Sequence, residues 1–228
     1  PEVKPPAIPE CDKWELPELL DREKEVVGIY LSAHPLDGFR FEMENYGITP
    51  INEMEANKSR NIRIAGYVTD VGHMTSKKGT KFGKLTINDY SGNFEIMFWE
   101  KNYVQYGNYL VDSQKLMIQG VYDENRFQPG RMEFQIQNIM LLDEVRKQLT
   151  KRLHISLPLL RVDDEFVNFI EQNVKNHPGN TELILYVTDW NGMEVRLKSQ
   201  GRKIEVNDEL IGYLLEHEED IQYSLDKT

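Results

Sequence analysis

Four lysines and one phenylalanine lie close together in the nine-residue segment 76–84, SKKGTKFGK. Lysines attract phosphate groups, and a phenyl ring offers a flat surface on which a nucleic-acid base can stack. Two glycines in the segment allow the backbone to come close to a ligand. The alternative is a solvated hairpin loop, in which lysines are common. We favour binding, and the candidate residues of this segment are Lys77, Lys78, Lys81, Phe82 and Lys84.

Charge is distributed unevenly around this segment. The whole chain of 228 residues carries a formal net charge of −11, which at first argues against nucleic-acid binding. Residues 60–142, however, contain ten basic and eight acidic side chains, whereas both flanking parts are acidic. The middle part therefore permits contact with a polyanion, and the acidic part after residue 142 suits protein partners better.

Composition and motifs argue against several other functions. The single cysteine, Cys11, rules out a disulfide framework, and no Cys/His cluster or Walker lysine loop occurs. No Asp-x-Asp pair is present, and Asp163 and Asp164 are expected to cap a helix. The chain is thus predicted to hold no catalytic residue, metal or cofactor. No apolar run approaches the roughly 18 residues of a membrane span and no secretion leader is visible, so we expect a cytoplasmic protein.

Between residues 60 and 142 the hydrophobic pattern has the period of two that is typical of β-strands. We expect five short strands, with turn residues such as 91–93 between them and one helix, at 101–111, between strands three and four. This order is typical of an OB-fold, a small and partly open all-β barrel. In that fold the loop between strands one and two, the loop between strands four and five, and the face of strands two and three form the oligonucleotide groove.

Alternation along the expected strands assigns side chains to the inside or the outside of the barrel. The expected interior consists of Ile62, Ile64, Leu85, Ile87, Phe94, Ile96 and Phe98. The outward-facing candidates for DNA contact are Arg63, Tyr67 and Trp99, to which the second loop adds Arg126, Phe127 and Arg131. Glu95 on the same face would repel a phosphate. Trp99 could equally be covered by the neighbouring helix or domain.

The parts around the barrel have different compositions. Residues 1–13 contain four prolines and are expected to form a flexible linker, followed by a helical connector at 14–59. Residues 143–228 alternate between strand-like and helical patterns, which predicts a small α+β domain, and its acidic charge makes it a candidate protein-interaction domain. The predicted fold class is therefore mixed: a short helical connector, the OB-fold nucleic-acid-binding domain at 60–142, and the α+β domain.

The segment 23–37, EKEVVGIYLSAHPLD, resembles the region just before the OB-fold in the alpha subunit of bacterial DNA polymerase III, a C-family replicative polymerase. Within the barrel the resemblance rests on Gly66, Thr75, Lys77, Lys78, Gly79, Asp89, Ser91, Gly92 and Phe98, and further on it rests loosely on His177, Pro178 and Gly179. It implies a non-catalytic C-terminal part of a DNA-directed DNA polymerase, a nucleotidyltransferase. It also implies that the barrel binds single-stranded DNA template during DNA replication, and that the C-terminal domain docks replisome partners, including the clamp-loader tau subunit.

Other interpretations stay open. The barrel could be a protein-interaction platform without autonomous DNA binding, or an anticodon-binding OB module of a tRNA synthetase. The resemblance also implies a glutamine–hydrophobic peptide that docks in the sliding clamp, to which residues 222–225 are a partial match. Because these residues also alternate like a strand, we favour a strand, and a sliding-clamp contact is doubtful.

Overall fold

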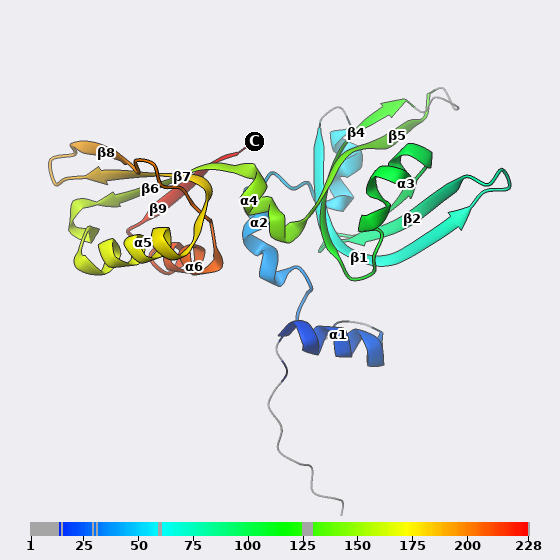
Figure 1. The fold of residues 1–228 in the computed structure, drawn as a ribbon, viewed down its shortest axis with the longest axis horizontal. Coiled ribbons are helices and arrows are strands. Elements are labelled where there is room, and N and C mark those ends of the chain that lie inside the picture. The colour runs from blue at the N-terminus through cyan, green and yellow to red at the C-terminus, as the bar shows by residue number, and fades with distance from the viewer. Residues whose placement is uncertain are drawn as a thin grey trace, which may run out of the picture.

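The structure is a computed structural model that describes residues 14, 16–28, 30, 32–58, 61–124 and 130–227. Figure 1 shows a curved sheet on the right, a flatter sheet with helices below it on the left, and short helices between and beneath them. The expected flexible linker, residues 1–13, lies outside the described residues. In the part of the chain that the structure describes, no helix is long and apolar enough to cross a membrane.

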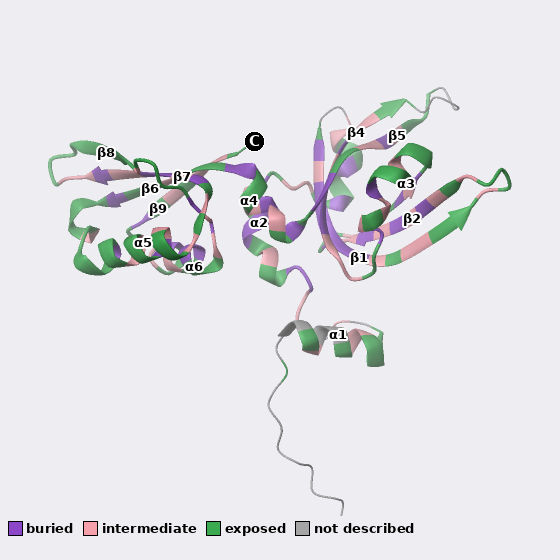
Figure 2. Cartoon of the chain, viewed as in Figure 1, coloured by how far each residue is buried: buried purple, intermediate pink, exposed green. Residues whose placement is uncertain are grey.

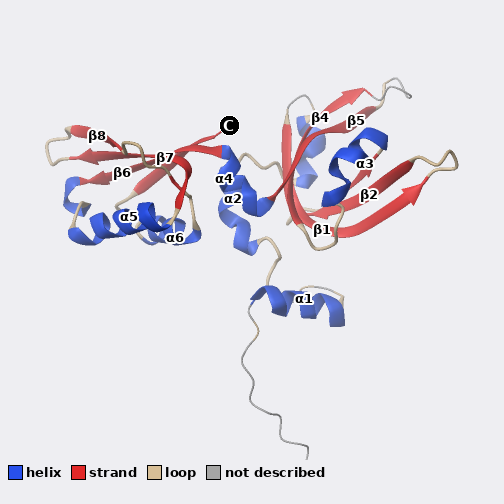
Figure 3. Cartoon of the chain, in the orientation of Figure 1, coloured by secondary structure: helices blue, strands red, loops and turns tan. Residues whose placement is uncertain are grey.

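Five antiparallel strands form the first sheet (Figure 3), in the order β3-β2-β1-β4-β5. Their bounds are β1 (Ile62–Thr75), β2 (Lys81–Asn88), β3 (Asn93–Phe98), β4 (Lys115–Glu124) and β5 (Met132–Leu141). The helix α3 (Glu100–Tyr106) connects β3 to β4. The five strands and the single helix stand in the order that the sequence predicts, so the OB-type architecture is confirmed.

Side chains close the gap between the two edge strands of this barrel. Phe94 of β3 and Phe134 of β5 meet edge to face, with 5.7 Å between their ring centroids. The predicted interior residues are at most 3% exposed, except Phe94, which is half-buried against the same core. Figure 2 shows the resulting buried stretches along β1 and β2. Gly83 on β2 has no room for a side chain, because a Cβ there would lie 2.3 Å from Leu110.

The C-terminal domain is the expected α+β unit, with a four-stranded sheet in the order β8-β7-β6-β9. Its strands are β6 (Thr150–Pro158), β7 (Pro178–Thr188), β8 (Glu194–Lys198) and β9 (Gln222–Lys227). The helix α5 (Asp164–Asn176) links the parallel strands β6 and β7, and α6 (Asp208–Glu216) precedes β9. Both helices lie on one face of the sheet (Figure 1).

Two details of this domain settle alternatives left open by the sequence. The Asp163 carboxylate accepts a hydrogen bond of 2.8 Å from the Phe166 amide, so the acidic pair at 163–164 opens a helix as predicted. Residues 222–225 form part of β9 and pair with β6, which confirms the strand interpretation. Within that strand, Tyr223 and Leu225 pack against the apolar cores.

An apolar cluster joins the connector, the barrel and the C-terminal domain. The connector contains α1 (Leu16–Val27), a short 3-10 helix (Asp37–Phe39), α2 (Arg40–Asn45) and a second 3-10 helix (Ile51–Asn57). Its Leu36 and Tyr46 are fully buried against residues of β1, β4, β5 and the helix α4 (Val145–Leu149). This junction cluster consists of Leu36, Phe41, Tyr46, Ala65, Tyr67, Met117, Met140, Leu142, Val145, Leu149, Val206 and Ile211.

A buried ion pair accompanies the junction cluster. Arg146 of α4 contacts the carboxylate of Glu42 on α2, and its guanidinium carbon lies 5.2 Å from the centre of the Phe41 ring. The Glu42 side chain is only 2% exposed, and burial raises its pKa above the ordinary value although Arg146 opposes this effect. Arg146 also contacts Asp208, whose side chain is 91% exposed. Breaking the buried Glu42–Arg146 pair should therefore reduce stability more than breaking the exposed contact with Asp208.

We expect Arg146→Ala to lower the free energy of unfolding by about 3–5 kcal/mol, because it leaves the Glu42 carboxylate buried without a cation. Glu42→Gln should lower that free energy less, because Arg146 then keeps its ion pair with Asp208. The double variant should be more stable than Arg146→Ala alone. Urea denaturation measures all three proteins, with Asp208→Asn as the exposed control, and strictly additive effects would contradict the pairing.

Candidate nucleic-acid interface

Three large side chains form a row across the outer face of β1, β2 and the end of β3. Met74 lies opposite Phe82 in the β1–β2 register, and Gly83 lies opposite Phe98, which places Trp99 beside Phe82. The Phe82 and Trp99 rings stack, with centroids 4.9 Å apart and planes 22° apart. Trp99 stays 53% exposed and Met74 38% exposed. The Met74–Phe82–Trp99 row is thus a preformed aromatic surface open to solvent.

The lysine-rich hairpin stands at the same end of the sheet. Its turn is held by a hydrogen bond of 2.8 Å from the Ser76 amide to the Thr80 carbonyl, and by Gly79, whose φ of +80° favours glycine. Lys77, Lys78 and Lys81 are all exposed. Among the described residues none of these three forms an ion pair with an acidic side chain. The hairpin therefore presents three uncompensated positive charges beside the aromatic row.

Lys84, the fourth lysine of the segment, has a different environment. Its ammonium nitrogen lies 2.8 Å from Asp70 on β1 and 3.3 Å from Glu95 on β3. The hydrogen bond to Asp70, followed by that to Glu95, raises the pKa of Lys84 above its ordinary value. Two carboxylates thus surround one ammonium group in the middle of the sheet face. Lys84 is already partnered, and the acidic excess around it opposes a phosphate.

The expectation that Tyr67 faces solvent for base stacking is wrong. Its side chain is 8% exposed, and the rings of Tyr30 and His34 pack edge-on against it, each with a centroid distance of 5.4 Å. Both covering residues belong to the segment 23–37. Packing of the connector against the barrel therefore hides the far end of the sheet face.

Arg63 is likewise engaged by the connector. Its guanidinium donates a hydrogen bond of 3.3 Å to the Tyr46 carbonyl, and its own backbone carbonyl accepts one of 2.7 Å from Thr49. The residue lies at an isolated bridge to Ile48. Arg63 thus holds the connector on β1, a role that alternation alone does not reveal.

The second predicted loop contributes only one described candidate. Arg126 and Phe127 lie outside the described residues, whereas Arg131 is exposed just before β5. On the first loop, sequence reasoning missed Met74 because β1 continues to Thr75 after a register shift between Val68 and Asp70. Among the described residues no group of three His, Cys, Asp or Glu side chains is placed to hold a metal ion.

Comparison with known proteins first defines the class of the barrel. Residues 62–142 match the family model described as "OB-fold nucleic acid binding domain", which covers all five strands of the first sheet. Residues 153–226 match a second model, "DNA polymerase III alpha subunit, C-terminal domain".

Curated relatives extend the match to most of the chain. DNA polymerase III subunit alpha of Escherichia coli K12 is 29% identical over 173 residues, which are 75% of this chain and 15% of the relative. The Vibrio cholerae subunit is 27% identical over 181 residues, 79% of this chain and 15% of the relative. The predicted resemblance to the C-terminal region of DNA polymerase III alpha subunits is confirmed. The chain spans about 15% of the length of these relatives.

Solved structures include a replication factor A related protein from Methanobacterium thermoautotrophicum. It is 17% identical to the chain with a TM-score of 0.29, and the match covers 42% of this chain and 91% of that one. A score this low supports no conclusion about shared fold or function.

The ion pairs of Lys84 with Asp70 and Glu95 predict that removing the two carboxylates strengthens binding of an oligonucleotide. Replacing Asp70 by Asn and Glu95 by Gln should free the Lys84 ammonium group, so the double variant should bind a single-stranded oligonucleotide more tightly. The slope of log affinity against log salt should steepen by about 0.7, the value for one more phosphate contact. Fluorescence anisotropy measures both quantities. Glu218→Gln with Glu219→Gln removes the same charge from an exposed site in the C-terminal domain, and equal gains in both double variants would contradict a local effect of Lys84.

Proposed function

We propose that the chain is the non-catalytic C-terminal part of a replicative DNA polymerase, the alpha subunit of DNA polymerase III. In this proposal the parent protein is a DNA-directed DNA polymerase, the barrel binds single-stranded template, and the C-terminal domain docks replisome partners. The resemblance of segment 23–37, the two family models and the curated relatives support the parent assignment. The role of the barrel is argued from its own surface.

One observation carries the DNA-binding proposal: a half-exposed aromatic stack lies next to three exposed lysines that have no acidic partner in the described part of the chain. Because Phe82 supports one face of Trp99, the indole is already oriented and its exposed surface is available to a base. Stacking of a base on an aromatic side chain contributes about 1–3 kcal/mol and depends little on base identity. Lys77, Lys78 and Lys81 supply the attraction for the phosphates on either side of that base.

The shape of the open surface also supports a preference for single strands. A base can reach the Trp99 ring only when it is not paired and stacked inside a duplex. The covered and acidic parts of the sheet face leave a short site at the hairpin end, where few nucleotides make contact. We therefore expect weak, sequence-independent binding that falls as salt rises.

Fluorescence anisotropy of a labelled oligothymidine, titrated with the 228-residue chain at low and moderate salt, tests this function. Lys77→Ala, Lys78→Ala and Lys81→Ala together should weaken binding at least tenfold at low salt and reduce the salt slope by about 2. Trp99→Ala should weaken it about tenfold through lost stacking, with little change in the slope.

The matched control removes three unpaired positive charges from the C-terminal domain instead: Lys175→Ala, Arg202→Ala and Lys203→Ala. This variant should bind the oligonucleotide as well as the parent chain does. Binding that survives the hairpin variant, or that is equally strong for a duplex, would refute a template site on the barrel.

The acidic C-terminal domain supports the second half of the proposal. Its 17 acidic and 11 basic residues make a broad DNA contact unfavourable, which suits a protein partner. By resemblance the partner is the clamp-loader tau subunit. Surface plasmon resonance with that subunit should detect binding that the hairpin variant leaves unchanged. Loss of tau binding in the hairpin variant would instead place the contact on the barrel.

A further inference from the structure

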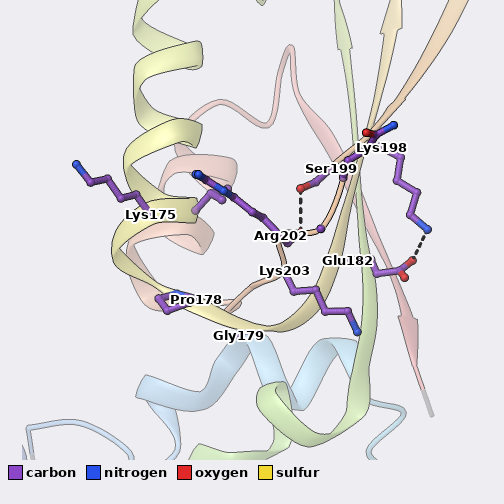
Figure 4. Close-up of a pocket in the computed structure, with 11 residues that line it drawn as sticks. Lys175, Pro178, Gly179, Glu182, Lys198, Ser199, Arg202 and Lys203 are labelled. Carbon is purple, nitrogen blue, oxygen red and sulfur yellow. Dashed lines mark hydrogen bonds and ion pairs between the residues drawn. The ribbon is translucent and has the colours of Figure 1, made fainter.

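A continuous groove runs along the C-terminal domain between α5 and the edge strand β8. It consists of two adjoining hollows of about 1080 and 520 Å³ that share Val174, Lys175, Lys198, Ser199 and Arg202. Figure 4 shows the larger one: Lys175 comes from α5, while Arg202 and Lys203 come from the loop after β8. A hydrogen bond of 2.8 Å from the Ser199 hydroxyl to the Arg202 carbonyl holds this loop.

The floor of the groove is apolar. Ile170 and Val174 of α5 face the aliphatic side chains of the sheet, and Leu197 is 48% exposed at the rim. On the same side of β8, Val195 is 49% exposed. None of the residues that line the two hollows is aromatic. Such a floor accepts aliphatic side chains and offers no surface on which a base could stack.

The rim is basic although the domain is acidic. Within the described residues, no carboxylate forms an ion pair with Lys175, Arg202 or Lys203. The carboxylate of Glu182, which also lines the groove, forms ion pairs with Lys198 at 3.1 Å and with Arg152 at 3.2 Å. Glu171 also lines the groove and reduces the excess without cancelling it. The rim therefore attracts acidic groups.

The backbone of β8 has unused hydrogen-bonding groups along this groove. The Asp189 backbone amide donates to the Met193 carbonyl at 2.9 Å, and the Ser199 backbone amide donates to the Leu183 carbonyl at 3.2 Å. These bonds fix the register of the antiparallel pair of β7 and β8. Because hydrogen-bonded positions alternate, the N–H and C=O groups of residues 194, 196 and 198 face away from β7. In the described chain no further strand lies beside them.

We propose that an extended acidic segment of a partner protein adds to β8 as a fifth strand of this sheet. Its aliphatic side chains would cover the floor of the groove, and its carboxylates would meet Lys175, Arg202 and Lys203. Main-chain hydrogen bonds to an exposed edge supply affinity in this mode, and the alternate side chains supply specificity. The proposal rests on the protein-docking half of the proposed function and assigns that role to one surface.

The test uses a ten-residue peptide that alternates glutamate with valine, titrated into the isotopically labelled 228-residue chain and followed by NMR. The amide signals of β8 and α5 should shift, and binding should weaken with salt. Arg196→Pro removes an outward N–H group without touching the pairing with β7, so it should weaken binding about tenfold. Arg196→Ala, which removes only the charge, should weaken it less than threefold.

Two further variants keep the backbone intact. Lys175→Ala, Arg202→Ala and Lys203→Ala together should weaken peptide binding about tenfold while leaving oligothymidine binding unchanged. Leu197→Gln should weaken binding even if Arg196→Pro proves unfolded by circular dichroism. Equal binding of a lysine–valine peptide, competition by oligothymidine for the groove, or concentration-dependent pairing of two β8 edges would each overturn the proposal.

The tau experiment separates failure of the groove from failure of the docking role. If the peptide shifts signals only on another face, or shifts none while tau still binds, the groove assignment is wrong and the docking role stands. If neither peptide nor tau binds, both are wrong. If tau binding is lost in the Arg196→Pro variant and kept in Arg196→Ala, the groove is the docking surface.

Discussion

The packing of the connector onto the barrel is the constraint on which the functional surface depends. Leu36 and Tyr46 are fully buried in the junction cluster, and Tyr67 on β1 lies under Tyr30 and His34. Apolar burial of this kind is the main favourable term in folding. Here it also determines which part of the sheet is exposed to solvent, because the contacts that hold the connector also bury one end of the barrel face.

The remaining face is divided by charge. Asp70 and Glu95 flank Lys84 in the middle of the sheet, whereas the exposed lysines of the hairpin have no carboxylate partner among the described residues. A phosphate approaching the middle meets two carboxylates and one ammonium group, and one approaching the hairpin meets three exposed lysines. The charges and the Met74–Phe82–Trp99 row thus both favour binding at the same end of the barrel. Neither this row nor the ion pairs of Lys84 can be recognised from net charge alone.

Alternation along the strands predicts the barrel core well, because the predicted interior residues are aliphatic or aromatic and follow one another at a spacing of two within each strand. It predicts the outer face poorly. The register shift after Val68 changes the phase of β1 and brings Met74 beside Phe82, which strict alternation misses. The burial of Tyr67 and the ion pairs of Lys84 escape prediction for another reason: the residues that contact them are distant in sequence or on other strands, and a pattern within one strand carries no information about them.

A small site at the end of a barrel is consistent with a segment that works as part of a longer chain. Effective concentration within one molecule allows a contact that is weak in isolation to be occupied most of the time. The same reasoning applies to the groove beside β8, where a short strand of five residues offers few backbone hydrogen bonds. In the proposed function, two small surfaces on separate domains, joined by a buried apolar junction, would hold template and partner on one molecule. Weakening the junction should therefore impair their joint action more than it impairs either contact measured alone.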